Sequence, residues 1–371
     1  MRVRSATLEE LELPLVEPFE TSFGVETTRR FLLLRLESAD GLVGYGECAA
    51  ATEPLYSGES IDTAREVLLR HLLPPVVHAP SVTADGFRSD VARFRANRMA
   101  KATVETALMD LEGKQQRRSV ADLLGGGRAR IEVGVSVGIQ PTVAALVRRV
   151  GAYLDSGYRR VKLKVRPGWD ARPLRAVRQA YPDIELWVDA NQAYPTRAVE
   201  RIREWAERYH VAQVEQPFPE RAIRAHARLA RDARFRVCLD ESIVDEASLE
   251  DALEARALSS LNVKTARVGG VVPGRALAQR AARDRVPAWV GGMLESGVGR
   301  AHNVQLASLP VFTLPGDLSA SDRYYAREIV EPPFVLGPGS TLAVPNRPGI
   351  GVEVDPVAVR RARRRAVTLR R

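Results

Sequence analysis

Five charged residues recur at nearly equal intervals in the middle of the chain: Lys164, Asp189, Glu215, Asp240 and Lys264. The intervals between them are 25, 26, 25 and 24 residues. Each of the five follows a short, mostly apolar run, so each is expected to end a β-strand. One strand–helix unit of a barrel has about this length, and barrel enzymes keep their sites where the strands end. The spacing therefore predicts that the five side chains gather at one rim of a barrel.

The three acids in this set, Asp189, Glu215 and Asp240, would repel one another strongly if they converged without a counter-ion. A hard divalent cation relieves this repulsion, and oxygen-only ligands favour Mg²⁺, with Mn²⁺ as a second choice, over zinc. The alternative is that each acid pairs with a lysine or arginine close by. We expect the metal site, because three acids in phase are hard to explain by folding alone.

The lysines place basic groups around this expected metal site. Lys162 and Lys164 share one face of a strand, because side chains two residues apart point the same way. Lys264 ends a later strand, so it lies across the barrel from Lys164. Nearby cations lower a lysine pKa toward the working pH, and bound metal stabilises the enediolate that forms when a carboxylate loses its α-proton. The set therefore predicts removal of a proton from the carbon next to a carboxylate.

The surrounding sequence contains two folding patterns. Residues 3–50 are strand-like and residues 60–127 carry apolar positions at helical spacing, which predicts an α+β domain over 1–130. Over 131–319, short β-branched runs alternate with amphipathic helices, as in parallel βαβ units. Seven or eight such units close a barrel, whereas an open doubly wound sheet would need a glycine-rich loop that is missing here. The loop-rich residues 320–371 are expected to return to the first domain.

Composition limits the classes of function. No apolar run reaches about 18 residues, and no signal-peptide core follows the N-terminus, so we expect no membrane span and a cytoplasmic location. Cys48 and Cys238 lie in apolar runs and are expected to be reduced core residues. The net charge is +9, and without the seven arginines of the basic tail, residues 360–371, it is +2. This tail is expected to be solvated or frayed, and no aromatic residues or zinc spacing support nucleic-acid binding.

Taken together, these motifs resemble the enolase superfamily and its muconate-lactonizing-enzyme-like subgroup. The matching strings are Lys162-x-Lys164, Asp189-Ala190-Asn191, Glu215-Gln216-Pro217, Asp240-Glu241-Ser242 and Asn262-Val263-Lys264. Three longer strings, 18–24, 291–303 and 314–321, are similar to the o-succinylbenzoate synthase / N-succinylamino acid racemase family. The resemblance covers nearly the whole chain. It implies an α/β fold, a (β/α)7β modified TIM barrel with an α+β capping domain.

The resemblance also implies a role for each site residue. Lys164 would abstract the α-proton and then assist loss of hydroxide as water, and Lys264 would steady the intermediate or act as a second base. The acids Asp189, Glu215 and Asp240 would bind Mg²⁺. The other implied residues hold the carboxylate (Lys162), line the substrate (Ser136, Asn191, Gly292, Met293), close the lid (Phe19, Tyr56) or support these groups (Glu241, Arg267). Simple packing is the alternative for Phe19, Tyr56 and Met293.

Two activities on a small-molecule carboxylate fit this resemblance. The first is o-succinylbenzoate synthase of menaquinone biosynthesis, which dehydrates 2-succinyl-6-hydroxy-2,4-cyclohexadiene-1-carboxylate. The alternative is an N-succinylamino acid racemase, and one site could serve both. A dipeptide epimerase is a more distant alternative, because Asp317-Leu318-Ser319 breaks the Asp-x-Asp pattern that such enzymes use. A non-catalytic anion-binding protein is favoured only by the basic tail. We expect a homo-oligomer and no nucleic-acid or membrane partner.

Overall fold

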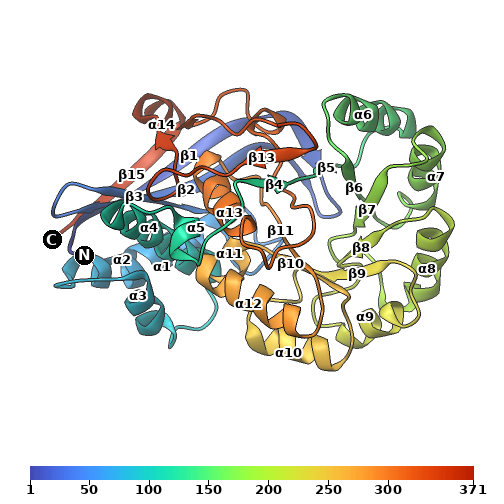
Figure 1. Ribbon diagram of the computed structural model, residues 1–371, viewed down its shortest axis with the longest axis horizontal. Helices are drawn as coiled ribbons and strands as arrows, with labels where there is room; N and C mark the ends of the chain where they lie inside the picture. Colours follow the sequence, from blue (N-terminus) through green and yellow to red (C-terminus); the bar gives the residue numbers. More distant parts are fainter.

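A parallel sheet of seven strands forms the centre of the computed structural model, which describes residues 1–371. Strands that follow one another in the sequence are neighbours in the sheet (Figure 1). The strands are short and buried on both faces, as in parallel sheets that helices cover. Their bounds are β5 (Val135–Val137), β6 (Arg160–Lys164), β7 (Glu185–Asp189), β8 (Gln213–Glu215), β9 (Arg236–Leu239), β10 (Ser260–Val263) and β11 (Ala288–Val290).

The sheet closes on itself through an extended segment around Gly316. Gly316 pairs in parallel with Val133, next to β5, and Asp317 pairs in parallel with Gly291, next to β11. The Asp317 N–H donates to the Val290 carbonyl at 3.0 Å. This segment acts as the eighth strand, so the predicted (β/α)7β barrel is confirmed.

Helices follow the barrel strands and cover the outside of the sheet. Several begin at a side chain that accepts a hydrogen bond from the first turn, such as Thr142 before α6 and Asp245 before α10. The helices are α6 (Val143–Asp155), α7 (Ala171–Ala180), η2 (Thr196–Ala198), α8 (Val199–Arg208), α9 (Ile223–Ala230), α10 (Glu246–Glu254), α11 (Thr265–Val268), α12 (Val271–Arg283) and α13 (Gly297–Ala307).

A second body, called the cap below, lies beside the barrel and is built on an antiparallel sheet of order β15-β1-β2-β3 (Figure 1). The long helix α4 (Arg98–Gln116) lies against β3, because Gly44 and Gly46 carry no side chain to hold it away. The other cap elements are β1 (Val3–Glu20), β2 (Val25–Ser38), β3 (Val43–Cys48), β15 (Arg363–Arg370), α1 (Ile61–Val67), η1 (Leu68–Leu72), α2 (Leu73–His78), α3 (Ala84–Val91) and α5 (Val120–Leu123). We propose 1–130, 131–319 and 320–371 as the cap, the barrel and the returning segment.

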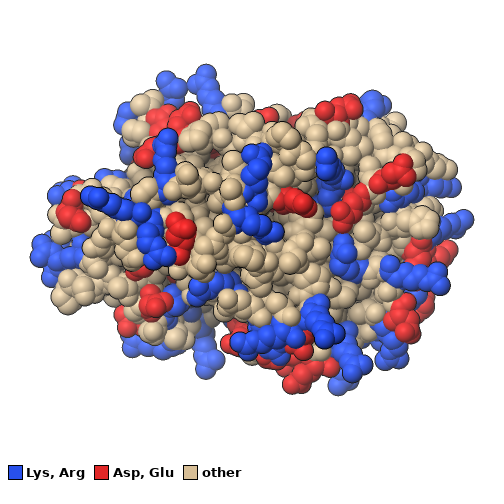
Figure 2. Space-filling model, viewed as in Figure 1, with Lys and Arg blue, Asp and Glu red and all other residues tan.

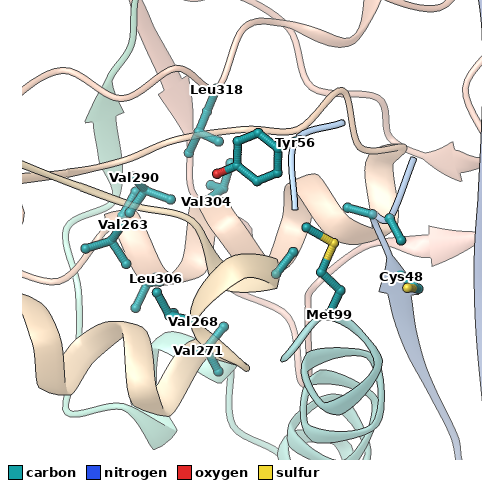
Figure 3. Packing of buried hydrophobic residues seen from close by; sticks show 14 of the residues in the cluster. Cys48, Tyr56, Met99, Val263, Val268, Val271, Val290, Val304, Leu306 and Leu318 are labelled. Atoms are coloured by element: carbon teal, nitrogen blue, oxygen red, sulfur yellow. The ribbon is translucent and has the colours of Figure 1, made fainter. Parts of the chain in front are cut away.

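The cap and the barrel share one hydrophobic core. Figure 3 shows part of it, where Cys48 and Met99 of the cap belong to the same cluster as Val268 and Leu306 of the barrel. Both cysteines are free and buried, as expected. At the same junction Glu47 of β3 accepts hydrogen bonds from the backbone N–H groups at the start of α13. The partial positive charge at a helix N-terminus favours a carboxyl group in this position. Contacts of this kind hold the cap over one end of the barrel.

The arginine-rich C-terminus forms strand β15, so it is not frayed, but most of its residues are exposed, as a solvated tail was expected to be. Strand β15 pairs antiparallel with β1, and its arginines form ion pairs with Glu9, Glu10 and Glu12. Figure 2 shows basic and acidic side chains interspersed over the visible face. None of the helices is both long enough and apolar enough to cross a membrane. The remaining elements are β4 (Arg130–Glu132), η3 (Ser321–Arg323), β12 (Val330–Glu331), β13 (Thr341–Ala343), β14 (Glu353–Val354) and α14 (Pro356–Ala362).

Candidate active site

A cavity of about 400 Å³ lies where the cap covers the ends of the barrel strands. Most of the residues that the sequence nominated line it: Phe19, Tyr56, Ser136, Lys162, Lys164, Asp189, Asn191, Lys264, Gly292 and Met293. The other nominated residues, Glu215, Asp240, Glu241 and Arg267, are buried, and each contacts a lining residue or its neighbour. The structure therefore brings the whole predicted set together around one cavity.

The in-phase spacing has a direct cause in the strand register. Lys164 pairs with Asp189 on the neighbouring strand, and Asp189 pairs with Glu215 on the next. These three residues are therefore at one level of the barrel. Asp240 and Lys264 come directly after β9 and β10, at the same end of the sheet. Because each strand–helix unit has a similar length, each returns the chain to this rim.

Lys164 is held at the rim by two oxygens. Its ammonium group donates to Asp189 Oδ2 and to Asn191 Oδ1, both at 2.6 Å. The Asn191 backbone adopts a positive φ of 41° and is held there by its N–H, which donates to Asp189 Oδ1 at 2.9 Å. The ammonium lies 6.0 Å from the Phe19 ring of the cap. Lys164 thus points into the cavity under the edge of the cap.

Lys264 approaches from a different side of the barrel rim. Its ammonium group donates to Asp240 Oδ2 at 2.8 Å and lies 4.4 Å from the Tyr56 ring of the cap. Arg267 binds the other oxygen of Asp240 and donates to the Ile243 carbonyl at 2.7 Å. Burial alone would lower the pKa of Lys264, but Tyr56 and neighbouring carboxyl groups raise it.

Lys162 lies deeper than Lys164 on the same strand face. Its ammonium is 2.6 Å from Glu215, 2.5 Å from Asp317 and 3.4 Å from Asp189. Burial alone would lower the pKa of Lys162, but these three carboxylates raise it, so the side chain stays an ammonium. Among the three acids, Asp317 was not nominated from the sequence as a site residue.

Each of the three proposed metal ligands is bonded to a basic side chain, as the local-pairing alternative anticipated. No group of three or more acids, histidines or cysteines stands together as a preformed ligand set. The chemistry of the donors nevertheless fits a hard cation, since all are buried carboxylates. Burial and Asp189 raise the pKa of Glu215, and a buried oxygen of Glu241 has no hydrogen-bond partner. A cation would relieve both effects.

Two functional candidates were missed by the sequence reasoning. Asp317 ends the closing segment of the barrel, 53 residues after Lys264, so it falls outside the regular spacing. Arg323 lies between the cap and the barrel: its guanidinium is 5.7 Å from the Phe19 ring and donates to the Ser136 carbonyl at 3.2 Å. The string 314–321 contained a signal for Asp317, but nothing in the sequence singled out Arg323.

Comparison with known proteins matches both parts of the chain. Residues 4–125 match the family described as mandelate racemase / muconate lactonizing enzyme, N-terminal domain, and residues 145–358 match the enolase C-terminal domain-like family. An N-succinylamino acid racemase from an Amycolatopsis species is 44% identical over 96% of each chain. An o-succinylbenzoate synthase from Geobacillus kaustophilus is 39% identical over 96% of this chain and 94% of its own. A solved enolase-superfamily member from Listeria innocua is 36% identical, with a TM-score of 0.94 over 100% of this chain and 99% of its own.

Proposed function

Since the chain belongs to the enolase superfamily, with the two domains of its mandelate racemase / muconate lactonizing enzyme family, we propose that it removes the α-proton of a small carboxylate substrate. The activity we propose is o-succinylbenzoate synthase: loss of water from 2-succinyl-6-hydroxy-2,4-cyclohexadiene-1-carboxylate, in menaquinone biosynthesis. The observation that carries the proposal is the placement of Lys164 and Lys264 at one cavity, each bonded to a different carboxylate. Relatives that bear the synthase name support it.

Lys164 performs both proton transfers in the proposed dehydration. In its neutral form it takes the α-proton, so the C–H electron pair stays on the substrate. The same lysine, now an ammonium, gives that proton to the departing hydroxyl group as the C–O bond breaks, and water leaves. Asp189 and Asn191 accept from the ammonium and hold it in place between the two steps. One group serves both steps because the hydrogen and the hydroxyl leave from the same face of the ring.

The negative charge that develops on the substrate carboxylate requires nearby cations. When bound, Mg²⁺, or Mn²⁺ in its place, would be held by Asp189, Glu215 and Asp240 and would supply this charge stabilisation. Lys162 adds an ammonium that stays charged beside the same carboxylates. Lys264 presents a second ammonium from across the cavity, oriented by Asp240.

We propose that the walls of the cavity accommodate the acyl chain of the substrate. A side-chain carbon at Gly292 would lie 2.8 Å from the Asp317 carbonyl, so a larger residue there would clash with the backbone of the segment that closes the barrel. We propose that Gly292, Met293 and Ser136 line the succinyl chain, and that Phe19 and Tyr56 close over the ring. The Ser22 hydroxyl donates to the Asn191 carbonyl at 3.1 Å, which ties the cap loop to the barrel rim.

N-succinylamino acid racemase is the second candidate activity. The Amycolatopsis relative and one from Thermus thermophilus, 43% identical, both bear this name. In this reaction one lysine would take the α-proton from one face and the other would return a proton to the opposite face. Lys164 and Lys264 approach the cavity from different strands, as such a pair requires. We propose that one site catalyses both reactions in the cytoplasm, with the enzyme a homo-oligomer.

A paired assay on one preparation tests this proposal. We would measure the dehydration and, separately, the exchange of deuterium into both enantiomers of N-succinyl amino acids. Dehydration is the expected result, with or without exchange, and Lys164→Ala abolishes both. Exchange without dehydration would make the racemase the function, and neither reaction in the Mg²⁺-loaded protein would refute the proposal. Substantial dehydration by Lys164→Ala would refute the assigned base.

A further inference from the structure

Asp317 is a buried carboxylate on the wall of the active-site cavity. One oxygen accepts from the Lys162 ammonium at 2.5 Å and from the Ser136 hydroxyl at 2.8 Å, and the other binds Arg160. Arg160 also donates to the Gly316 carbonyl at 2.7 Å, so it joins β6 to the segment that closes the barrel. Donors from two strands therefore hold this carboxylate in a single orientation.

The Lys162 ammonium divides its contacts between two kinds of carboxylate. Glu215, at 2.6 Å, and Asp189, at 3.4 Å, belong to the proposed metal-ligand set. Asp317, at 2.5 Å, lies outside that set. A divalent cation held by Glu215 and Asp189 would repel the ammonium, and a buried ammonium without a partner is costly. The one remaining carboxylate in contact with Lys162 is then Asp317.

We propose that Asp317 is a positioning residue: it keeps Lys162 bonded when Glu215 and Asp189 turn to the metal ion, and it thereby strengthens ion binding. Without Asp317, the ammonium would stay on Glu215 and compete with the ion for the same oxygens. The inference rests on the proposed function, because it presupposes the metal site.

The surroundings of Lys162 favour this exchange of partners. The ammonium lies 4.9 Å from the Trp289 ring, whose face attracts a cation. The Arg160 guanidinium likewise lies over an aromatic ring, 4.4 Å from that of Trp187. Arg160 binds the Asp317 oxygen that does not contact Lys162. The Lys162 ammonium already contacts Asp317, so the exchange requires little movement of this side chain.

Mn²⁺ binding to the purified full-length chain, followed by electron paramagnetic resonance and calorimetry, tests the inference. Four proteins are compared: the unaltered protein, Asp317→Asn, Lys162→Met and the double variant. Removing an outer partner of a metal ligand typically weakens binding about 10- to 100-fold, so we expect Asp317→Asn to bind Mn²⁺ at least about tenfold more weakly. With Lys162 replaced by methionine the competitor is gone, and Asp317→Asn should then have no effect on the affinity.

Two results would overturn the inference. Asp317→Asn could bind Mn²⁺ as tightly as the unaltered protein, or it could weaken binding equally in both backgrounds, which would mean that its charge acts on the ion directly. Failure of the unaltered protein to bind Mn²⁺ is a separate result, and it would refute the proposed function itself. If Asp317→Asn does not fold, the same comparison is made with Asp317→Glu. Glutamate keeps a negative charge beside Arg160, but its longer side chain moves the carboxylate oxygen away from Lys162. An effect of Asp317→Glu only where Lys162 is present supports the inference, and an equal effect in both backgrounds overturns it.

Discussion

The Tyr56 hydroxyl donates a hydrogen bond to Asp240 at 2.8 Å, although the two residues are 184 positions apart and belong to different bodies of the fold. The ring of the same tyrosine lies 4.4 Å from the Lys264 ammonium. A single cap residue therefore contacts both a proposed metal ligand and a proposed catalytic lysine, through different parts of its side chain.

Two substitutions separate the effect of the Tyr56 hydroxyl from the effect of its ring. Tyr56→Phe keeps the ring and removes the hydroxyl, so it should weaken Mn²⁺ binding about three- to tenfold, the value of one hydrogen bond, with a smaller effect on turnover. Tyr56→Leu also removes the ring face and should lower kcat further. Calorimetry with Mn²⁺ and steady-state kinetics measure the two effects. Equal kinetics for both variants would mean that the ring has no role.

Lys264→Arg distinguishes a cation from a base at this position. Arginine keeps the positive charge but does not deprotonate in proteins. Racemisation of N-succinyl amino acids, which needs a second base, should fall by about 10²–10⁴-fold. Dehydration needs only the charge and should fall much less. The paired assay on the same preparation gives both rates, and an equal loss in both reactions would contradict the assignment of two roles.

Removal of divalent metal should abolish activity reversibly. We expect a chelator to stop dehydration and added Mg²⁺ to restore it, because the ion would stabilise the negative charge that develops on the substrate carboxylate. Asp189→Asn should lower Mn²⁺ affinity, which equilibrium dialysis measures. Glu204→Gln is the matched control, since this acid on α8 is largely exposed and far from the rim in the fold. Full activity in the chelated, metal-free protein would remove the ion from the mechanism.

The contribution of two buried glutamates to stability should decrease as the pH rises toward neutrality. Burial raises the pKa of both Glu47 and Glu105 from 4.5 to about 7. The folded state then holds these protons more tightly than the unfolded state, so their stabilising effect is complete below pH 4.5 and is lost as the pH rises through about 7. Each group contributes roughly 3 kcal/mol at most to this change.

Chemical denaturation at intervals between pH 5 and pH 8 measures this change in the free energy of unfolding. Glu105→Gln should reduce the slope, because an amide does not titrate, and Glu204→Gln should leave it unchanged. Glu105 accepts from the N–H groups of Val271 and Val272 at the start of α12, so the same variant reports on the junction of cap and barrel. An unaltered slope in Glu105→Gln would show that this group does not take up the proton.

The sequence predicted which side chains gather at the barrel rim, because their positions depend on a local quantity, the length of each strand–helix unit. Lys164, Asp189 and Glu215 lie side by side for that reason alone. Asp317 could not be placed in this way, since its segment inserts between the two edges of the sheet and breaks the interval. The role of the C-terminal arginines was equally hidden: Arg365 pairs with Glu10, which is 355 positions away. Pairings over such distances depend on tertiary structure, and no local pattern encodes them.

The position of β15 beside β1 has a consequence for biosynthesis. The ribosome makes β1 about 340 residues before its partner strand β15, so one edge of that sheet stays uncovered until β15 has been made. An open edge can pair with other chains. During this interval the nascent chain depends on the acidic side chains of β1, or on a chaperone, to avoid aggregation.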